Sequence, residues 1–132
     1  SSESHQYFKG ILSGKSRAIF SGKELVEKDA QKSFADQKDL NLLLSRGAEI
    51  DTKPSLEIYA DDVKCTHGAT AGHVDRDTLF YLMSRGLDKK TATGILIKGF
   101  ADEIINGILL DDLRLFIQDD LGNLLPELNF EE

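Results

Sequence analysis

Several residue types are scarce in this 132-residue chain, and each scarcity excludes a class of protein. Tryptophan is absent and aromatic residues make up 8% of the chain, so a core must rest mainly on Leu, Ile, Val and Phe. The single cysteine, Cys65, excludes an internal disulfide and is typical of a reducing compartment. No apolar run reaches the length of a membrane span, and the first residues lack the regions of a signal peptide. We therefore expect a cytoplasmic protein that does not enter a membrane.

Basic residues are also in short supply, because 16 Lys and Arg stand against 23 Asp and Glu. The formal net charge is −7, and most of this excess lies after residue 74. A phosphate surface repels such a chain, so we expect neither a nucleic acid nor an anionic membrane as partner. The hydrophobic content of 40% and the charged content of 30% indicate a folded globular chain.

The first part of the chain, residues 1–72, has the texture of β-structure. Apolar and polar residues alternate in 56–60 and 63–67, as expected for half-buried strands. We interpret Ser13-Gly14-Lys15 and Ser21-Gly22-Lys23 as turns, and Gly68-Ala69-Thr70-Ala71-Gly72 as a tight connection from strand to helix. The predicted strand segments are residues 7–12, 17–20, 24–28, 31–35, 40–44, 49–52, 56–60 and 63–67.

The second part, residues 75–132, has helical patterning. Asp75 and Asp88 are suited to cap two helices, Gly86 to end the first, and a third helix is predicted over 111–121. Residues 127–132 form an acidic tail that we expect to be frayed. The apolar stripes predicted to form the core of this part are Leu79, Phe80, Leu82, Met83, Ile95, Leu96, Phe100 and Ile104.

Strands first and helices afterwards predict a mainly β chain followed by α-structure, not alternating βαβ units. The spacing of the strands is irregular. Spacing alone therefore leaves a sandwich, a barrel and a stacked β-solenoid open.

One constellation, Cys65-Thr66-His67, could carry chemistry. The chain has no phosphate-binding loop, no Gly-x-Ser-x-Gly elbow, and no Cys-x-x-Cys or His-Glu-x-x-His motif. On a strand, Cys65 and His67 share one face. The pair fits a buried cysteine beside a hydrogen-bonded histidine, two ligands of a metal or iron–sulfur cluster, or a nucleophile with its base. Two residues cannot complete a tetrahedral metal site, so further ligands would have to come from a partner or a bound molecule.

Longer segments resemble the SufB/SufD family of iron–sulfur cluster assembly proteins. The resemblance is carried by 56–70, LEIYADDVKCTHGAT, by 77–87, DTLFYLMSRGL, and by the upstream stretches YFKGILSG, NLLLS and AEIDTKP. It extends from about residue 7 to the long helix and leaves the acidic tail unmatched. The Cys-x-His-Gly-Ala-Thr form favours the SufD branch over SufB. Members of the family are much longer, so we expect this chain to be a C-terminal fragment.

The resemblance implies the final coils of a right-handed parallel β-helix in 1–72 and a small α-helical domain in 75–132. It further implies a non-catalytic subunit that pairs with SufB and docks a SufC ATPase, with clusters built at the SufB/SufD interface. His67 matches the histidine implicated in cluster assembly, and Cys65 matches the neighbouring cysteine. No intrinsic cofactor is implied, only iron or a transient cluster at the interface. In a plant or alga the compartment would be the plastid stroma.

We expect the helical part to meet SufC through two spare apolar positions, Ile97 and Leu109, and through the corner Ser84-Arg85-Gly86. A cut solenoid exposes unpaired backbone groups and interior surface, so we also expect the fragment to self-associate. A purely structural interaction module and a free-standing Cys–His enzyme are the alternatives.

Overall fold

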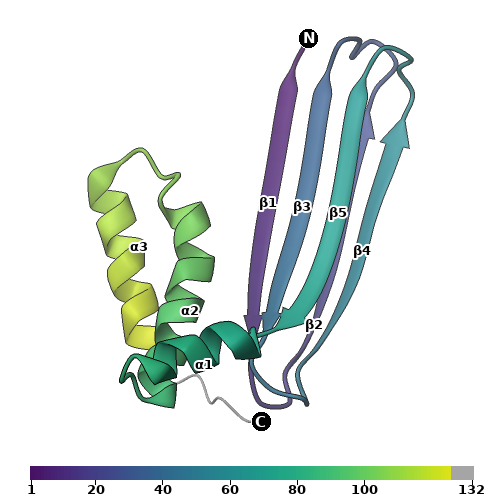
Figure 1. Ribbon diagram of the computed structural model, residues 1–132. Helices are drawn as coiled ribbons and strands as arrows, with labels where there is room; N and C mark the ends of the chain where they lie inside the picture. The colour runs from purple at the N-terminus through teal and green to yellow at the C-terminus, as the bar shows by residue number, and fades with distance from the viewer. Residues whose placement is uncertain (126–132) are drawn as a thin grey trace.

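The computed structural model describes residues 1–125, which form five strands followed by three helices (Figure 1). The acidic tail, residues 127–132, lies outside the described residues. The expected order of β-structure before α-structure is confirmed, and the change falls between His73 and Arg76. The strands are β1 (Glu3–Leu12), β2 (Arg17–Val26), β3 (Phe34–Leu43), β4 (Glu49–Ile58) and β5 (Lys64–His73). The helices are α1 (Arg76–Ser84), α2 (Lys89–Ile105) and α3 (Asp111–Leu124).

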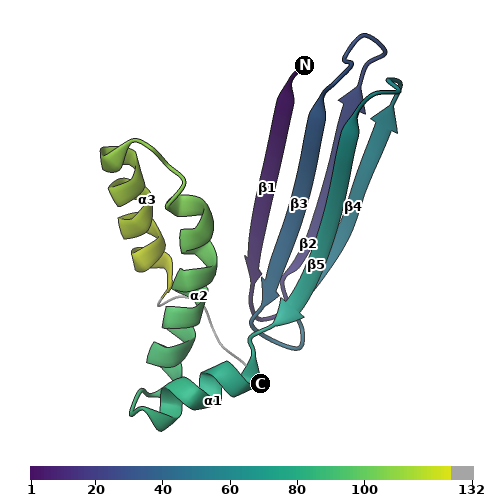
Figure 2. The same cartoon turned by 45° about the horizontal axis from the view of Figure 1, so that its top comes forward.

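Successive strands alternate between two sheets. One sheet has the order β1-β3-β5, the other contains β2 and β4, and every pair is parallel. Figures 1 and 2 agree that the two sheets form separate layers. Among the described residues, this purely parallel pairing excludes the hairpin-linked sandwich and the antiparallel barrel that strand spacing had left open.

Two predicted connections are wrong, because small residues there belong to strands. Ser21-Gly22-Lys23 lies inside β2, and Gly68-Ala69-Thr70-Ala71-Gly72 lies inside β5. The predicted segment 31–35 is mostly a turn in which Lys32 has a φ of 59°, and β3 begins only at Phe34. The turn at Gly14 is confirmed, with a φ of 62° that suits glycine.

The apolar core lies where the strands meet the helices. It is built from Leu44, Val74, Leu79, Ala92 and Ile97, which pack in one cluster. The inner face of β3 between the sheets is instead largely polar, and it buries Gln37, Asp39 and Asn41. The sheets are therefore stabilised mainly by their backbone ladders, while burial of apolar area attaches the helices.

The helices begin where the sequence predicts. The Asp75 carboxylate accepts a hydrogen bond from the Thr78 backbone N–H at 3.0 Å, and Asp88 accepts one from the Thr91 backbone N–H at 2.8 Å. No helix within residues 1–125 is long and apolar enough to cross a membrane.

The predicted apolar stripes are only partly buried. Leu79 is buried, and Leu82, Leu96 and Phe100 are half-buried. The prediction is wrong for the four exposed members, because two short packed helices bury only one narrow face each. The exposed members are Phe80, Met83, Ile95 and Ile104.

Candidate functional site

Strand β5 carries both residues of the Cys-x-His motif. Cys65 pairs in register with Ala35 of β3, and His67 pairs with Gln37. Residues paired in this way point to the same side of a sheet, and Ala35 and Gln37 are buried between the two sheets. The prediction that Cys65 and His67 share a face is confirmed, and this face is the inner one. Cys65 is half-buried and His67 is exposed.

The position of β5 explains this exposure. It is the last strand in the order β1-β3-β5, so within the described residues only one of its edges is hydrogen-bonded. In the opposite sheet β5 contacts β4, and within the described residues no further strand follows β4 there. The side chains of Cys65 and His67 therefore lie at an open end of the two-sheet stack.

Strand β2 of the other sheet faces β3, the neighbour of β5. The Gln37 side chain reaches across to Gly22, where an added Cβ would lie 2.6 Å from Gln37 Nε2. Gln37 Nε2 donates a hydrogen bond to Gln6 Oε1 at 2.8 Å. Glu24 follows Gly22 by two residues and so points to the same inner face. Both carboxylate oxygens of Glu24 are buried and have no hydrogen-bond partner.

The electrostatics link Glu24 to the motif. Burial raises the pKa of the Glu24 carboxyl, and the negative charge of Asp36 raises it further. The charge of His67 acts in the opposite direction on the same pKa, which places the two side chains within electrostatic reach. On the outer face, the Thr66 hydroxyl donates to the Asp36 carboxylate at 2.6 Å and lowers the pKa of Asp36.

The motif does not form a complete metal site by itself. Among residues 1–125, no group of three or more His, Cys, Asp and Glu side chains is arranged to hold a metal ion. Cys65 and His67 can offer a sulfur and a nitrogen, and further ligands must come from other donor types or from another chain.

The residues expected to meet SufC are not brought together. Ser84, Arg85 and Gly86 lie exposed at the end of α1, just before α2 begins, whereas Leu109 lies beyond the end of α2 with 94% of its surface exposed. A 17-residue helix separates them by roughly 26 Å. The expectation that Ile97 is a spare surface position is wrong, because Ile97 is 3% exposed and belongs to the core cluster.

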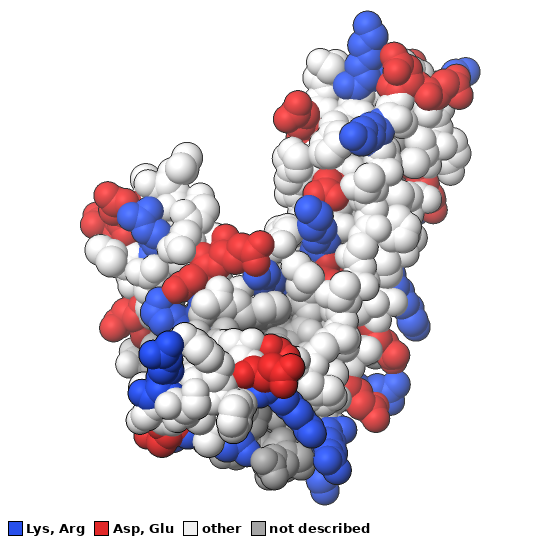
Figure 3. Space-filling view, in the orientation of Figure 1, with Lys and Arg blue, Asp and Glu red and all other residues white. Residues whose placement is uncertain are grey.

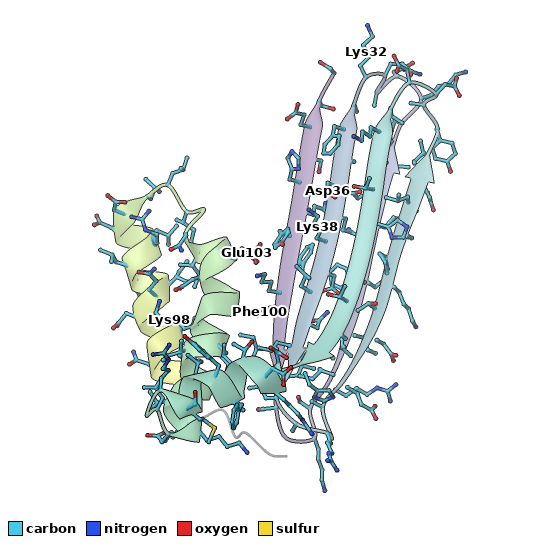
Figure 4. All side chains as sticks on the ribbon, in the orientation of Figure 1. Lys32, Asp36, Lys38, Lys98, Phe100 and Glu103 are labelled. Atoms are coloured by element: carbon cyan, nitrogen blue, oxygen red, sulfur yellow. The ribbon has the colours of Figure 1, made fainter. Side chains whose placement is uncertain are left out.

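Sequence patterns missed the contact between α2 and β1. Lys9 Nζ donates to the Phe100 backbone carbonyl at 2.7 Å, forms an ion pair with Glu103, and lies 4.3 Å from the centre of the Phe100 ring. The Tyr7 hydroxyl donates to Glu103 at 3.2 Å. Figure 4 shows Phe100 and Glu103 reaching from α2 toward this strand. The contacting residues are more than ninety positions apart in the sequence, so no local pattern could have predicted the contact.

The part of the chain that matches a known family includes all five strands, α1 and most of α2. Residues 1–100 match the family described as SUF system FeS cluster assembly, SufBD core domain. The chain belongs to the SufBD family.

Individual members of the SufBD family agree with this assignment. The chain is 43% identical over 123 residues to the iron–sulfur cluster assembly protein SufD of Escherichia coli. The aligned region covers 93% of this chain and 29% of that protein. It is 47% identical over 110 residues to an iron–sulfur cluster assembly SufBD family protein of Synechocystis, covering 83% of this chain and 24% of that protein. A SufD of Bacillus subtilis is 36% identical over 105 residues, covering 80% of this chain and 24% of that protein. The chain thus spans less than a third of the length of these SufBD relatives.

Proposed function

We propose that this chain is part of a SufD-type, non-catalytic subunit of the iron–sulfur cluster assembly machinery. Relatives named SufD match it over most of its length, and they are named as iron–sulfur cluster assembly proteins, which fits a role other than catalysis. The two parallel sheets are then coils of a right-handed parallel β-helix, since the chain passes alternately through both layers. The compartment would be a bacterial cytoplasm or a plastid stroma.

The observation that carries the proposal is the place of Cys65 and His67 on a strand that has one unpaired edge within residues 1–125. A free edge accepts a strand or a surface of another chain. In the proposed complex SufB covers this edge, and iron or a transient cluster lies between His67, Cys65 and ligands of SufB. Without SufB, the same edge would pair with a second copy of the chain.

A free-standing Cys–His enzyme has less support. A cavity beside Glu24 is lined mainly by β1, β2, the connection from β2 to β3 and the start of β3, and neither Cys65 nor His67 lines it. The proposed function is therefore the assembly role, with SufC as the proposed ATPase partner.

The test is genetic complementation of a strain that depends on the SUF system, using the complete protein. We expect His67→Ala to abolish or strongly reduce growth and cluster-enzyme activity, and Cys65→Ala to reduce them. His73→Ala is the matched control, because His73 is an exposed histidine on the same strand. Full complementation by His67→Ala together with Cys65→Ala would refute the proposed site and favour a purely structural module.

A further inference from the structure

The hydrogen bonds of the main chain show which groups of β5 point to its free edge. In a parallel ladder, successive residues of a strand direct their N–H and C=O groups alternately to its two edges. The Lys64 N–H donates to the Ser33 carbonyl at 3.0 Å, so the even-numbered residues of β5 point toward β3. The odd-numbered residues direct an uninterrupted row of donors and acceptors to the edge that is unpaired within residues 1–125. They are Cys65, His67, Ala69, Ala71 and His73.

Strand β4 presents the matching edge of the other sheet. Figures 1 and 2 show β4 and β5 at the same end of the stack, away from β1. The Glu49 N–H donates to the Ser16 carbonyl at 2.9 Å. The Tyr59 N–H, just beyond the other end of β4, donates to the Val26 carbonyl at 2.9 Å. The register between them is unbroken, so odd-numbered residues of β4 point toward β2. The even-numbered residues, Pro54 among them, point to the free edge.

Pro54 closes this edge of β4. Proline has no N–H, and its ring occupies the space where a donor would meet a neighbouring strand. The Pro54 nitrogen points away from β2, so the proline removes no hydrogen bond from the existing ladder. A proline at an edge strand prevents another strand from pairing there. A chain that docks at this end of the stack therefore meets one closed edge and one open edge.

The side chains of β5 indicate the kind of strand that fits the open edge. The strand has no acidic residue and carries Lys64, His67 and His73. A Cβ added at Gly68 or Gly72 would meet nothing within 4 Å, so there is open space beside the backbone at both positions. Large side chains of a neighbouring strand cover glycines of an edge strand. The edge therefore fits an extended segment with bulky side chains beside these glycines and a carboxylate opposite Lys64.

We propose that Pro54 directs the partner chain to β5, so that an extended segment of the partner lengthens the three-stranded sheet while the two-stranded sheet ends at β4. The inference rests on the proposed function, because the partner is then SufB. The main-chain groups of Cys65 and His67 hold the partner strand. Their side chains are thereby fixed on the inner face at the junction of the two chains.

The first experiment measures the affinity of purified SufB for the complete protein by calorimetry. Ala69→Pro removes one N–H from the free edge of β5 and should weaken binding about tenfold or more. Thr52→Pro is the matched control, because Thr52 is an even-numbered residue of β4 and its N–H points to the closed edge. It should leave the affinity unchanged. Neither proline removes a bond of the existing ladders, and circular dichroism checks that both variants fold.

A second measurement needs no variant. Amide hydrogen exchange, followed by mass spectrometry, compares peptides 64–73 and 49–58 of the complete protein with and without SufB. The complex should slow exchange in 64–73 about tenfold or more, and 49–58 should exchange as before. Unchanged exchange in 64–73, or wild-type affinity in a folded Ala69→Pro, would overturn strand addition at β5. Equal slowing of 49–58 would overturn the closure of β4.

Pro54→Val tests the proline itself, because valine restores the N–H and favours a strand. Without SufB, this variant of the complete protein should self-associate about tenfold more tightly than the wild type, measured by sedimentation. Unchanged self-association would overturn the role of Pro54. The proposed function fails on a separate readout, namely full complementation by His67→Ala with Cys65→Ala. Those two substitutions keep the main-chain donors of β5, so the doubly substituted protein should still bind SufB.

Discussion

At the scale of single residues, small side chains decide where large polar ones go. An added Cβ at Gly22 would lie 2.6 Å from the Gln37 amide, and one at Gly10 would lie 2.3 Å from the Asn41 oxygen. Each glycine thus leaves room on the inner face for a buried amide. The two glycines weaken their strands slightly in exchange for polar groups that reach across the interior.

The capping aspartates give a prediction about pH. Hydrogen bonds from the Thr91 backbone and hydroxyl lower the pKa of Asp88 in the folded chain. Stability from a lowered carboxyl pKa is present above the ordinary value of about 3.8 and is lost as the pH falls through the folded pKa. We expect Asp88→Ala to unfold at lower denaturant concentration than the wild type at pH 7, with the difference shrinking toward pH 3.

Asp88→Asn is the control for this prediction, because asparagine caps a helix nearly as well without the charge. Its denaturant midpoint should remain close to that of the wild type at pH 7. Because position 88 then carries no carboxyl group, its contribution to stability should not change with pH. If the denaturant midpoint of Asp88→Ala stays equally far below that of the wild type at every pH, the charged form of Asp88 is not what stabilises the helix.

At the scale of elements, one short set of contacts ties α2 to β1. Lys9, whose side chain is 6% exposed, reaches the Phe100 carbonyl and ring and the Glu103 carboxylate. Hydrogen bonds from Lys9 and Tyr7 lower the pKa of Glu103, as expected for a carboxylate held in its charged form. Figures 1 and 2 both show α2 beside the β1 edge of the three-stranded sheet.

Replacing this lysine tests the contact. Lys9→Met keeps most of the buried hydrocarbon but loses the charged hydrogen bonds, so we expect a loss of about 1.5 to 3 kcal/mol in the free energy of unfolding. Lys23→Met is the matched control, because Lys23 of β2 pairs with Glu57 with 54% of its side chain exposed. An exposed pair contributes about 0 to 1 kcal/mol. Equal losses in the two variants, measured by denaturant titration, would show that the α2–β1 contact adds no more stability than an exposed ion pair.

At the scale of the whole molecule, charge is spread and apolar exposure is concentrated in the helical part. Figure 3 shows acidic and basic side chains interspersed on the face that it displays. The connection from α2 to α3 and the first turn of α3 expose Leu109, Leu110 and Leu113. Adjacent exposed leucines are typical of an interaction surface.

We expect this leucine surface to be the one that meets SufC. Leu109→Ser combined with Leu110→Ser should weaken binding of purified SufC at least tenfold, measured by calorimetry with the complete protein. Ile19→Ser is the control, because Ile19 is an exposed apolar residue on β2, away from the helices. Arg85→Ala tests the opposite end of α2. A loss of SufC binding in Arg85→Ala alone would move the docking surface to the α1–α2 corner.

The local features of the fold could be predicted from the sequence. The capping positions Asp75 and Asp88, the turn at Gly14 and the shared face of Cys65 and His67 follow from rules that act within a few residues. Strands interrupted by small residues, as at Gly22 and in 68–72, were wrongly divided. A ladder formed with a strand some thirty residues away continues through a glycine that a local pattern takes for a turn.

Sequence alone determined the strand-to-helix order, the shared orientation of the cysteine and histidine, and the family resemblance, because each depends on neighbouring residues or on their order. Only the tertiary structure decided that Ile97 is buried, that Leu109 and Arg85 lie at opposite ends of α2, and that Gln37 lies between His67 of β5 and Gly22 of β2. These facts depend on how two parallel sheets stack and how a helix packs on their edge. Contacts between strands that are distant in sequence form only when the chain closes on itself, and no local period encodes them.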